Sequence, residues 1–385
     1  MLMRGNFCLP MDKVRSLSFH ADYRCRNSGK CCSTNWDVPV EVPIHRSLTE
    51  ALAAGRLTMA VAAAGLEPFV VGPDMPEDTA AMFQRTDTDQ CVFLDTSSRL
   101  CIVHRDLGEG ALAATCRHFP RLAVHDARGT FVALSHFCPT AASMLFREDV
   151  PVAIVEHPPS FPPADYEGLD ITAADLPPLL HPHMLMDLEA YGAWEQHMVA
   201  RCGDVTRVPE SILATLRRDA MALRQWRPGS QSLTDAIASL PRAYIDAGPA
   251  GDLHESLEQF CETLTAVPDD FKPEADEHGL AESFATFVRP AWERFHPPVN
   301  RYIAAKAFAT WTAYQGRGVA TIVRGIEAAV ALVRVEAARQ CRDANRPLDA
   351  DLLLEAFRSA DFTLNHLAVG EDLAHNWSRV ESGRV

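Results

Sequence analysis

The chain has 385 residues, 47% of them hydrophobic and 23% charged, which is typical of a soluble globular protein with room for two domains. Its net charge is −15, and residues 151–385 carry 21 Lys and Arg against 34 Asp and Glu, a surface that disfavours nucleic acid and anionic membranes. No apolar stretch is long enough to span a membrane, and residues 1–18 lack the apolar core of a secretory signal. We therefore expect a cytoplasmic protein. Its acidic part would suit a basic or lysine-bearing partner, although solubility alone also explains the charge.

The first 156 residues predict short, irregular elements. Residues 45–65 are rich in Ala and Leu and favour a helix. Residues 91–104 contain two short apolar runs around a polar turn, and 121–135 predict a β-hairpin that turns at Asp126–Gly129. Another helix is expected to start at Pro139. We interpret 1–156 as one α+β domain of irregular build.

A proline-rich segment, 157–183, follows and predicts a linker, because seven prolines exclude a regular helix or a central strand. From 184 to 385 apolar residues recur at three- and four-residue spacing, which predicts an all-α domain. The run 319–338 is apolar on more than one face and should be a central buried helix. The expected helices are 184–201, 209–225, 232–247, 253–266, 301–311, 318–341 and 348–367.

The 11 cysteines are unevenly distributed, and this is the strongest functional signal. In a reducing compartment structural disulfides are rare, so clustered thiols favour a metal site or thiol chemistry. Three cysteines lie in helical patterns and are most simply core residues: Cys202, Cys261 and Cys341. The other eight lie within the first 138 residues: Cys8, Cys25, Cys31, Cys32, Cys91, Cys101, Cys116 and Cys138.

Seven of these thiols occupy loop-like positions, and we predict that they converge on a metal centre. Between Cys25 and Cys31, the residues Asn27, Ser28 and Gly29 let the backbone turn around an ion or cluster. Cys31 and Cys32 are neighbours, and a disulfide between them would be strained. The predicted ligands are Cys25, Cys31, Cys32, Cys91, Cys101, Cys116 and Cys138.

The identity of the metal stays open at this point. Four thiolates are enough for one iron-sulfur cluster, whereas the spacing does not match the paired Cys-x2-Cys of a zinc ribbon. Arg117 and Arg121, together with His118, could offset the negative charge of the centre and donate hydrogen bonds to its sulfurs. The alternative is that each thiol is an ordinary buried cysteine. Trp36 and Phe93 are expected to pack around the site.

The cysteine segments also resemble a known family. The pattern Cys25…Cys31-Cys32…Cys91-x-Phe-Leu-Asp…Leu-Cys101-Ile…Cys116-Arg-x-Phe-Pro…Cys138-Pro resembles the CxxCxxCC family of zinc- or iron-chelating proteins, and most closely its flagellin lysine N-methylase group. The likeness is strong over 19–146 and fainter at Val299–Tyr302 and Phe362–His366. One departure is Ser28, which stands where the family has a further cysteine.

The resemblance implies ligation by the seven cysteines of an iron-sulfur cluster, 4Fe-4S by expectation, or of zinc. It also implies transfer of a methyl group from S-adenosylmethionine to lysines of a protein such as flagellin. The sequence itself shows no glycine-rich nucleotide turn and no Cys-x3-Cys-x2-Cys. No catalytic residue is assigned, and Asp95, Glu109 and Tyr302 are candidate bases only by their place in family-like segments.

We therefore predict a mainly α protein, with an irregular cysteine-rich α+β metal-binding domain followed by an all-α domain. The predicted function is metal binding. If the protein is an enzyme, the predicted activity is that of a lysine N-methylase. The alternative is a non-enzymatic zinc- or iron-chelating or electron-carrying protein.

Overall fold

The computed structural model describes residues 13–34, 36–60, 66–72, 75, 78–164, 166–172, 178–248, 251–272 and 277–379. These residues form two compact units. The small unit consists of Arg24–Arg121 together with Cys138–Thr140. The large unit consists of the described residues of Met1–Tyr23, Leu122–Phe137 and Ala141–Val385.

The large unit contains a five-stranded sheet with the order β10-β7-β8-β1-β9. Strand β1 runs parallel to β8, with Val14 opposite Thr130, and antiparallel to β9, with Ser16 opposite Val155. Strand β10 runs parallel to β7. The strands are β1 Val14–Leu17, β7 Arg121–Asp126, β8 Gly129–Leu134, β9 Ile154–Glu156 and β10 Gly168–Asp170.

This sheet corrects the predicted domain boundaries at 156 and 183. Strands from both ends of 1–156 pair in the large unit, so the division falls instead at residue 24 and residue 121. The proline-rich segment is also part of the large unit, where it supplies β10 and the hairpin of β11 Leu179–His181 and β12 Met184–Leu185. Phe161 and Leu180 are fully buried there, which a solvated linker would not show.

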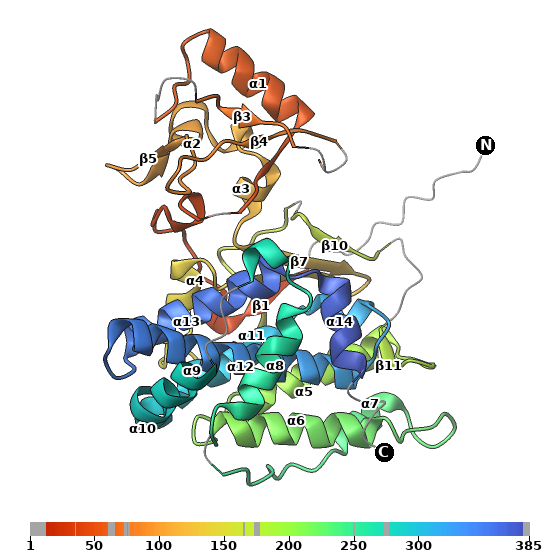
Figure 1. The fold of residues 1–385 in the computed structure, drawn as a ribbon. Coiled ribbons are helices and arrows are strands. Elements are labelled where there is room, and N and C mark those ends of the chain that lie inside the picture. The colour runs from red at the N-terminus through yellow and green to blue at the C-terminus, as the bar shows by residue number, and fades with distance from the viewer. Residues whose placement is uncertain are drawn as a thin grey trace, which may run out of the picture. The chain divides into compact units, whose positions relative to one another are not determined.

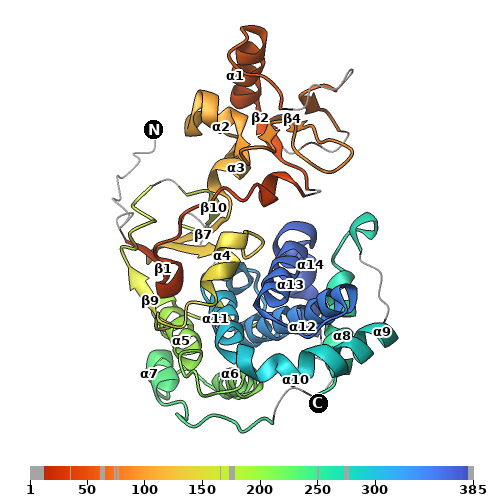
Figure 2. The ribbon, with the colours of Figure 1, turned by 90° about the vertical axis from the view of Figure 1, so that its left-hand side faces the viewer.

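Helices form most of the rest of the large unit, and the prediction of a mainly α protein is confirmed. Figure 2 shows the strands on one side of this unit and α8, α12, α13 and α14 on the other. The helices are α4 Pro139–Met144, α5 Leu188–Arg201, α6 Pro209–Leu223, α7 Leu233–Ala238, α8 His254–Leu264, α9 Glu277–Ser283, α10 Arg289–Trp292, α11 His296–Ala307, α12 Val319–Ala344, α13 Ala350–Phe362 and α14 Gly370–Arg379.

Helix α12 is the predicted central helix, and α6, α8, α11, α13 and α14 all contact it (Figure 1). Its Ala, Val, Ile and Leu residues are buried along most of its length. It ends at Asn345, which adopts the left-handed conformation (φ 49°) that commonly closes a helix. Asp349 precedes the next helix, α13, and caps it, because its side chain accepts a hydrogen bond from the Leu352 N–H.

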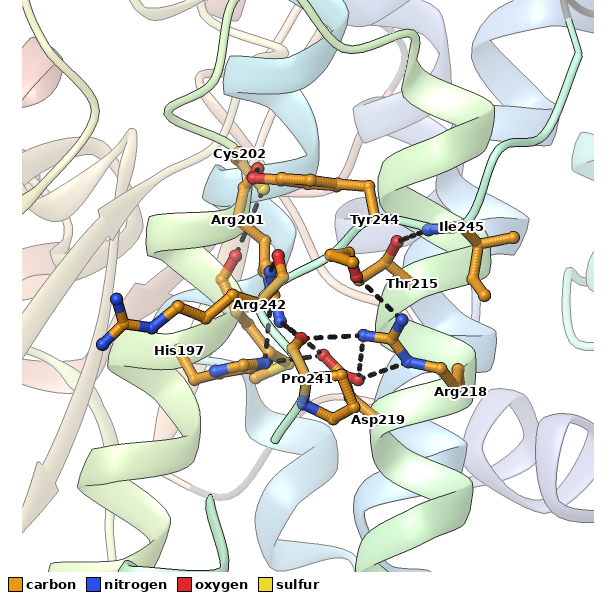
Figure 3. A network of polar contacts seen from close by, with 12 residues as sticks. His197, Arg201, Cys202, Thr215, Arg218, Asp219, Pro241, Arg242, Tyr244 and Ile245 are labelled. Atoms are coloured by element: carbon orange, nitrogen blue, oxygen red, sulfur yellow. Dashed lines mark hydrogen bonds and ion pairs between the residues drawn. The ribbon is translucent and has the colours of Figure 1, made fainter. Parts of the chain in front are cut away.

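A buried polar network explains why the predicted helix 232–247 stops at Ala238 (Figure 3). Pro241 cannot continue the helix hydrogen bonding, and its carbonyl instead accepts hydrogen bonds from Arg201 and Arg218. The same two arginines bind the carboxylate of Asp219, which is fully buried on α6 and also accepts a hydrogen bond from His197 on α5 (2.8 Å). The network therefore attaches an irregular segment to α5 and α6.

The small unit has its own apolar core and little regular structure. A three-stranded sheet of order β2-β4-β3 packs with α1 over a core that includes Val40, Leu48, Phe83 and Phe93. Its predicted helix 45–65 is only partly confirmed, since α1 ends at Ala53 and 61–65 lie outside the described residues. The elements are β2 Pro39–Glu41, α1 Val42–Ala53, β3 Phe69–Val70, β4 Thr79–Phe83, β5 Leu94–Asp95, β6 Leu100–Cys101, α2 Ile102–Leu107 and α3 Ala114–His118.

In the described part of the chain, no helix combines the length and apolarity that crossing a membrane requires.

Candidate metal centre

All seven predicted ligands belong to the small unit, and Cys8 lies outside the described residues. Six of them fall within Arg24–Arg121. The seventh, Cys138, belongs to Cys138–Thr140, a segment of three residues that packs with the small unit although the residues on both sides pack with the large one. The chain therefore leaves the small unit after Arg121 and rejoins it briefly at Cys138, the last predicted ligand.

The pair Cys31 and Cys32 lies in a single 3-10 turn, Lys30–Cys32. Gly29 begins this turn with a φ of 71°, a conformation that favours glycine, and a Cβ there would lie only 3.4 Å from Leu94 Cδ1. The two sulfurs are 3.9 Å apart and are not joined by a disulfide. The indole N–H of Trp36 donates to the carbonyl of Cys31 (2.8 Å), so Trp36 packs at the site as expected.

Three further cysteines lie in elements of the same unit, and one of them is joined directly to this turn. The N–H of Cys91 donates to the carbonyl of Cys32 (2.7 Å). Cys101 is paired with Leu94 in the small β5–β6 ladder that follows, as the two apolar runs predicted. Cys116 lies on α3, whose first N–H, that of Ala114, donates to the side chain of Glu41 (2.9 Å).

The electrostatics show that these five thiols influence one another. Burial, together with the charges of nearby Cys101 and Cys31, raises the pKa of Cys91 to about 11. Burial also raises the pKa of Cys116 well above its usual value, with contributions from Cys91, Cys101 and Cys31. The pKa of Cys101 rises through burial and the charge of Cys31. We call Cys31, Cys32, Cys91, Cys101 and Cys116 the five-thiol cluster.

Within the cluster, the neighbouring pair behaves differently from the rest. A hydrogen bond with Cys32 lowers the pKa of the Cys31 thiol to about 7. The same hydrogen bond, together with burial and the charge of Cys31, raises the pKa of Cys32 well above its usual value. Near neutral pH Cys31 is therefore the thiol of the cluster most readily ionised, and thiolates are the form that binds metals.

Arg85 is the cation that sequence reasoning missed. Its charge opposes the raised pKa of Cys91 and Cys116, and it contributes to the lowered pKa of Cys31. Its side chain is fixed by hydrogen bonds to the carbonyls of Trp36 (2.9 Å) and Asp89 (2.8 Å). Arg85 lies outside the cysteine motifs, and its only signal in the sequence is its position shortly before Cys91.

Arg117 and Arg121, the predicted cationic residues, flank Cys116 along the chain. The Nε of Arg117 contacts His118 Nε2 at 3.4 Å, and Nη1 of Arg121 donates to the carbonyl of Arg117 at 3.3 Å. Arg121 is thereby held against the helix that carries Cys116. Direct bonds from these two residues to a cluster stay a prediction.

Cys25 is the one predicted ligand that is exposed. Its sulfur accepts a hydrogen bond from the N–H of Asn27 (3.4 Å), which adopts a φ of 52° in the same loop. Cys138 is buried. Whether these two join the five-thiol cluster on one metal stays a prediction.

The described side chains form no ready-made metal site. Across the described ranges, the His, Cys, Asp and Glu side chains form no group of three or more already placed to hold a metal ion. The predicted convergence of four sulfurs on one point is thus not present in this structure. The sulfurs of the five-thiol cluster nevertheless fit a soft metal. Each buried thiol makes ionisation of its neighbours less favourable, and a cation between them would stabilise the thiolate form.

The segments with the fainter family likeness belong to the large unit, where Asp361 precedes one of them and contacts the other. Asp361 is fully buried, and its carboxylate accepts hydrogen bonds from the backbone N–H of His136 (2.6 Å) and from the Tyr302 hydroxyl (2.7 Å). The Lys306 ammonium lies 2.5 Å from Oδ1, the carboxylate oxygen that also accepts from Tyr302. Burial opposes ionisation, but Lys306 and His136 hold the pKa of Asp361 far below its usual value.

The three candidate bases do not come together in one unit. Asp95 and Glu109 belong to the small unit, and Tyr302 belongs to the large unit. Hydrogen bonds from Ser97 and Ser98 lower the pKa of Asp95 to about 2, which makes it a weak base. Burial and the charge of Asp361 raise the pKa of Tyr302 well above its usual value, so its hydroxyl keeps its proton near neutral pH.

No protein-family model, curated protein or solved structure matches this chain.

Proposed function

We propose that the small unit is a thiolate metal centre that holds an iron-sulfur cluster, 4Fe-4S by expectation, with zinc as the alternative metal. The observation that supports this proposal is the five-thiol cluster inside one compact unit, in which the sulfurs of Cys31 and Cys32 lie 3.9 Å apart and the Cys91 N–H binds the Cys32 carbonyl.

The chain's own residues would contribute three things to such a centre. Gly29 lets the Cys31–Cys32 turn form, and the hydrogen bond from Cys91 to Cys32 holds the second loop against it. Arg85 supplies positive charge. A bound cluster would add electron transfer or Lewis acidity, depending on the metal.

The test is anaerobic purification followed by metal analysis and an absorption spectrum. We expect iron and acid-labile sulfide in stoichiometric amounts, with broad visible absorption, or otherwise stoichiometric zinc without colour. A folded protein that contains neither metal, and takes up neither one on reconstitution, would refute the metal centre.

We further propose that the protein is a lysine N-methylase acting on a basic or lysine-bearing protein such as flagellin. Two observations support this. The first is the family resemblance over 19–146. The second is that three family-like segments contact one another around Asp361, through His136, Tyr302 and the Ser135–His366 hydrogen bond (3.0 Å). The acidic residues 151–385 would attract such a partner.

In this reaction the uncharged lysine Nζ attacks the methyl carbon of S-adenosylmethionine. The new N–C bond forms as the C–S bond breaks, S-adenosylhomocysteine leaves, and the amine nitrogen loses a proton. The structure gives no assigned base for this proton, because Asp95 is too acidic and Tyr302 is hydrogen-bonded to Asp361.

The methylase is tested by mass spectrometry of lysines in cells with and without the gene, together with S-adenosylmethionine binding to the metal-loaded protein. We expect mono- or dimethylated lysines that disappear with the gene. If the loaded protein neither binds S-adenosylmethionine nor changes any lysine's mass, the non-enzymatic metal-binding or electron-carrying alternative holds.

A further inference from the structure

The large unit contains a cavity of about 250 Å³ that none of the roles above uses. It lies between the sheet strands β7 and β8, the helices α11, α12 and α14, and the turn after α13. Its walls combine apolar residues with Lys306, Asn365 and Gln315. This mixture of an apolar body and a few polar groups is typical of a small-molecule site.

The charge of the lining is unusual for this chain. The chain carries 51 Asp and Glu against 36 Lys and Arg, yet none of the residues that line the cavity is acidic. Lys306 is the one charged residue in the lining. S-adenosylmethionine is a poor fit, because its sulfonium and ammonium groups would face no carboxylate in the lining.

The side chain of Lys306 is held in place by an ion pair with Asp361. Its ammonium lies 2.5 Å from Oδ1 of Asp361, and among the described residues this carboxylate is its one acceptor. Asp361 in turn receives hydrogen bonds from His136 on Oδ2 and from Tyr302 on Oδ1, and it does not line the cavity itself. A lysine has three N–H bonds, and two of them stay available to a ligand.

Trp377 supplies a second large side chain to the wall. Trp377 is buried, and its indole N–H has no hydrogen-bond acceptor within the described part of the chain. Its six-membered ring packs on Gly325 of α12, where a Cβ would approach to 2.8 Å. Trp377 therefore contributes the edge of its apolar ring to the wall.

At the rim, Trp311 and Val369 are large apolar residues with 44% and 48% of their surface exposed. Trp311 lines the cavity, and Val369 lies between two residues that do, Ala368 and Gly370. If a ligand bound in the cavity, its apolar part could pack against these exposed apolar residues, and both surfaces would be removed from water.

We propose that this cavity binds a small carboxylic acid with an apolar or aromatic body, whose carboxylate accepts hydrogen bonds from Lys306. The proposal goes beyond the metal centre and does not depend on it, because every residue it uses lies in the large unit.

The test uses three probes with one carbon skeleton and different charge: 4-phenylbutanoate, 4-phenylbutanamide and 4-phenylbutylamine. Binding to the full-length protein is measured by titration calorimetry. We expect the carboxylate to bind about tenfold more tightly than the amide, and the amine to bind least. If no probe binds at millimolar concentration, or if the amide or the amine binds as tightly as the carboxylate, the proposal is wrong.

A substitution at Lys306 would leave Asp361 buried without its cation and could unfold the protein. Asn365→Asp is the better variant, since Asn365 is exposed and the change adds only a negative charge to the lining. We expect it to remove the preference for the carboxylate over the amide. Gln225→Glu makes the same charge change at an exposed residue outside the lining and should leave the preference intact. An unchanged preference in Asn365→Asp would place the probe elsewhere and overturn the proposal.

Discussion

The backbone N–H of Cys91 donates a 2.7 Å hydrogen bond to the carbonyl oxygen of Cys32. This contact joins two loops that are far apart in the sequence, and each loop carries thiols of the five-thiol cluster. Because the bond is between backbone groups, it survives cysteine substitution. Single thiols can therefore be removed while the loops keep this connection.

The first prediction concerns the thiols themselves. Cys116→Ser and Cys31→Ser should each lower the bound metal per protein by more than half, because each removes a thiolate from the cluster. Cys261→Ser, on α8 of the large unit, is the matched control and should retain full metal. The measurement is metal analysis of anaerobically purified protein. Equal metal content in all three variants would contradict the assignment of the ligands.

The second prediction concerns the stability of the small unit. This unit is rich in loops, so metal ligation should contribute a large part of its folding free energy, about 10 kcal/mol by comparison with structural zinc sites. After chelation, trypsin should cut at exposed Arg26, Lys30 and Arg99, whereas the large unit resists. Adding the metal back should restore protection. Identical digestion patterns before and after verified metal removal would show that ligation does not stabilise this unit.

The third prediction concerns Asp219 in the buried network of Figure 3. Asp219→Asn should lower the free energy of unfolding of the large unit by about 2–4 kcal/mol, because Arg201 and Arg218 lose their carboxylate. Thermal or urea unfolding measures this loss. Asp204→Asn, at a partly exposed ion pair with Arg207, is the control and should cost less than about 1 kcal/mol.

The same residue gives a pH dependence. Burial opposes its ionisation, but His197 and Arg218 hold the folded-state pKa of Asp219 below its usual value. Its stabilising contribution is therefore present above the unfolded-state pKa of about 3.9 and is lost as the pH falls through the folded-state value. The stability difference between the wild type and Asp219→Asn should thus be constant near neutral pH and shrink below about pH 4. A difference that grows on acidification would contradict this account.

The fourth prediction concerns Gly129, which has a φ of 128° and packs against β1. A Cβ there would lie 2.4 Å from the carbonyl oxygen of Lys13, which accepts the N–H of Thr130. Gly129→Ala should therefore destabilise the large unit by about 2 kcal/mol or more. Gly248→Ala, where a Cβ meets nothing within 4 Å, should be nearly neutral in the same unfolding experiment.

Local patterns predicted the local elements. The apolar run of α12 and the turn Asp126–Gly129 both specify their structure within one short segment, and both were found. The predicted helix 232–247 was too long, because it included Pro241, where arginines from α5 and α6 bind the backbone carbonyls. A local sequence pattern cannot predict these arginine partners, because they lie in other parts of the chain.

The predicted domain boundaries were wrong for a similar reason. Pairing of β1 with β8 and β9 brings together residues near 14, 130 and 155, and periodicity within a window cannot show it. For the site, the density of cysteines indicated the five-thiol cluster, since that signal lies in the sequence itself. Arg85 was missed, because its role depends on a backbone pairing with Cys91.

X-ray absorption at the metal edge of the anaerobically purified protein tests the central claim most directly. The account predicts a metal with mainly sulfur ligands, at about 2.3 Å, and a loss of sulfur ligation in Cys116→Ser relative to Cys261→Ser. For an iron-sulfur cluster it also predicts a second shell of iron. A metal bound only by nitrogen and oxygen, or a fully folded protein that binds none, would contradict the claim that the five-thiol cluster is a metal centre.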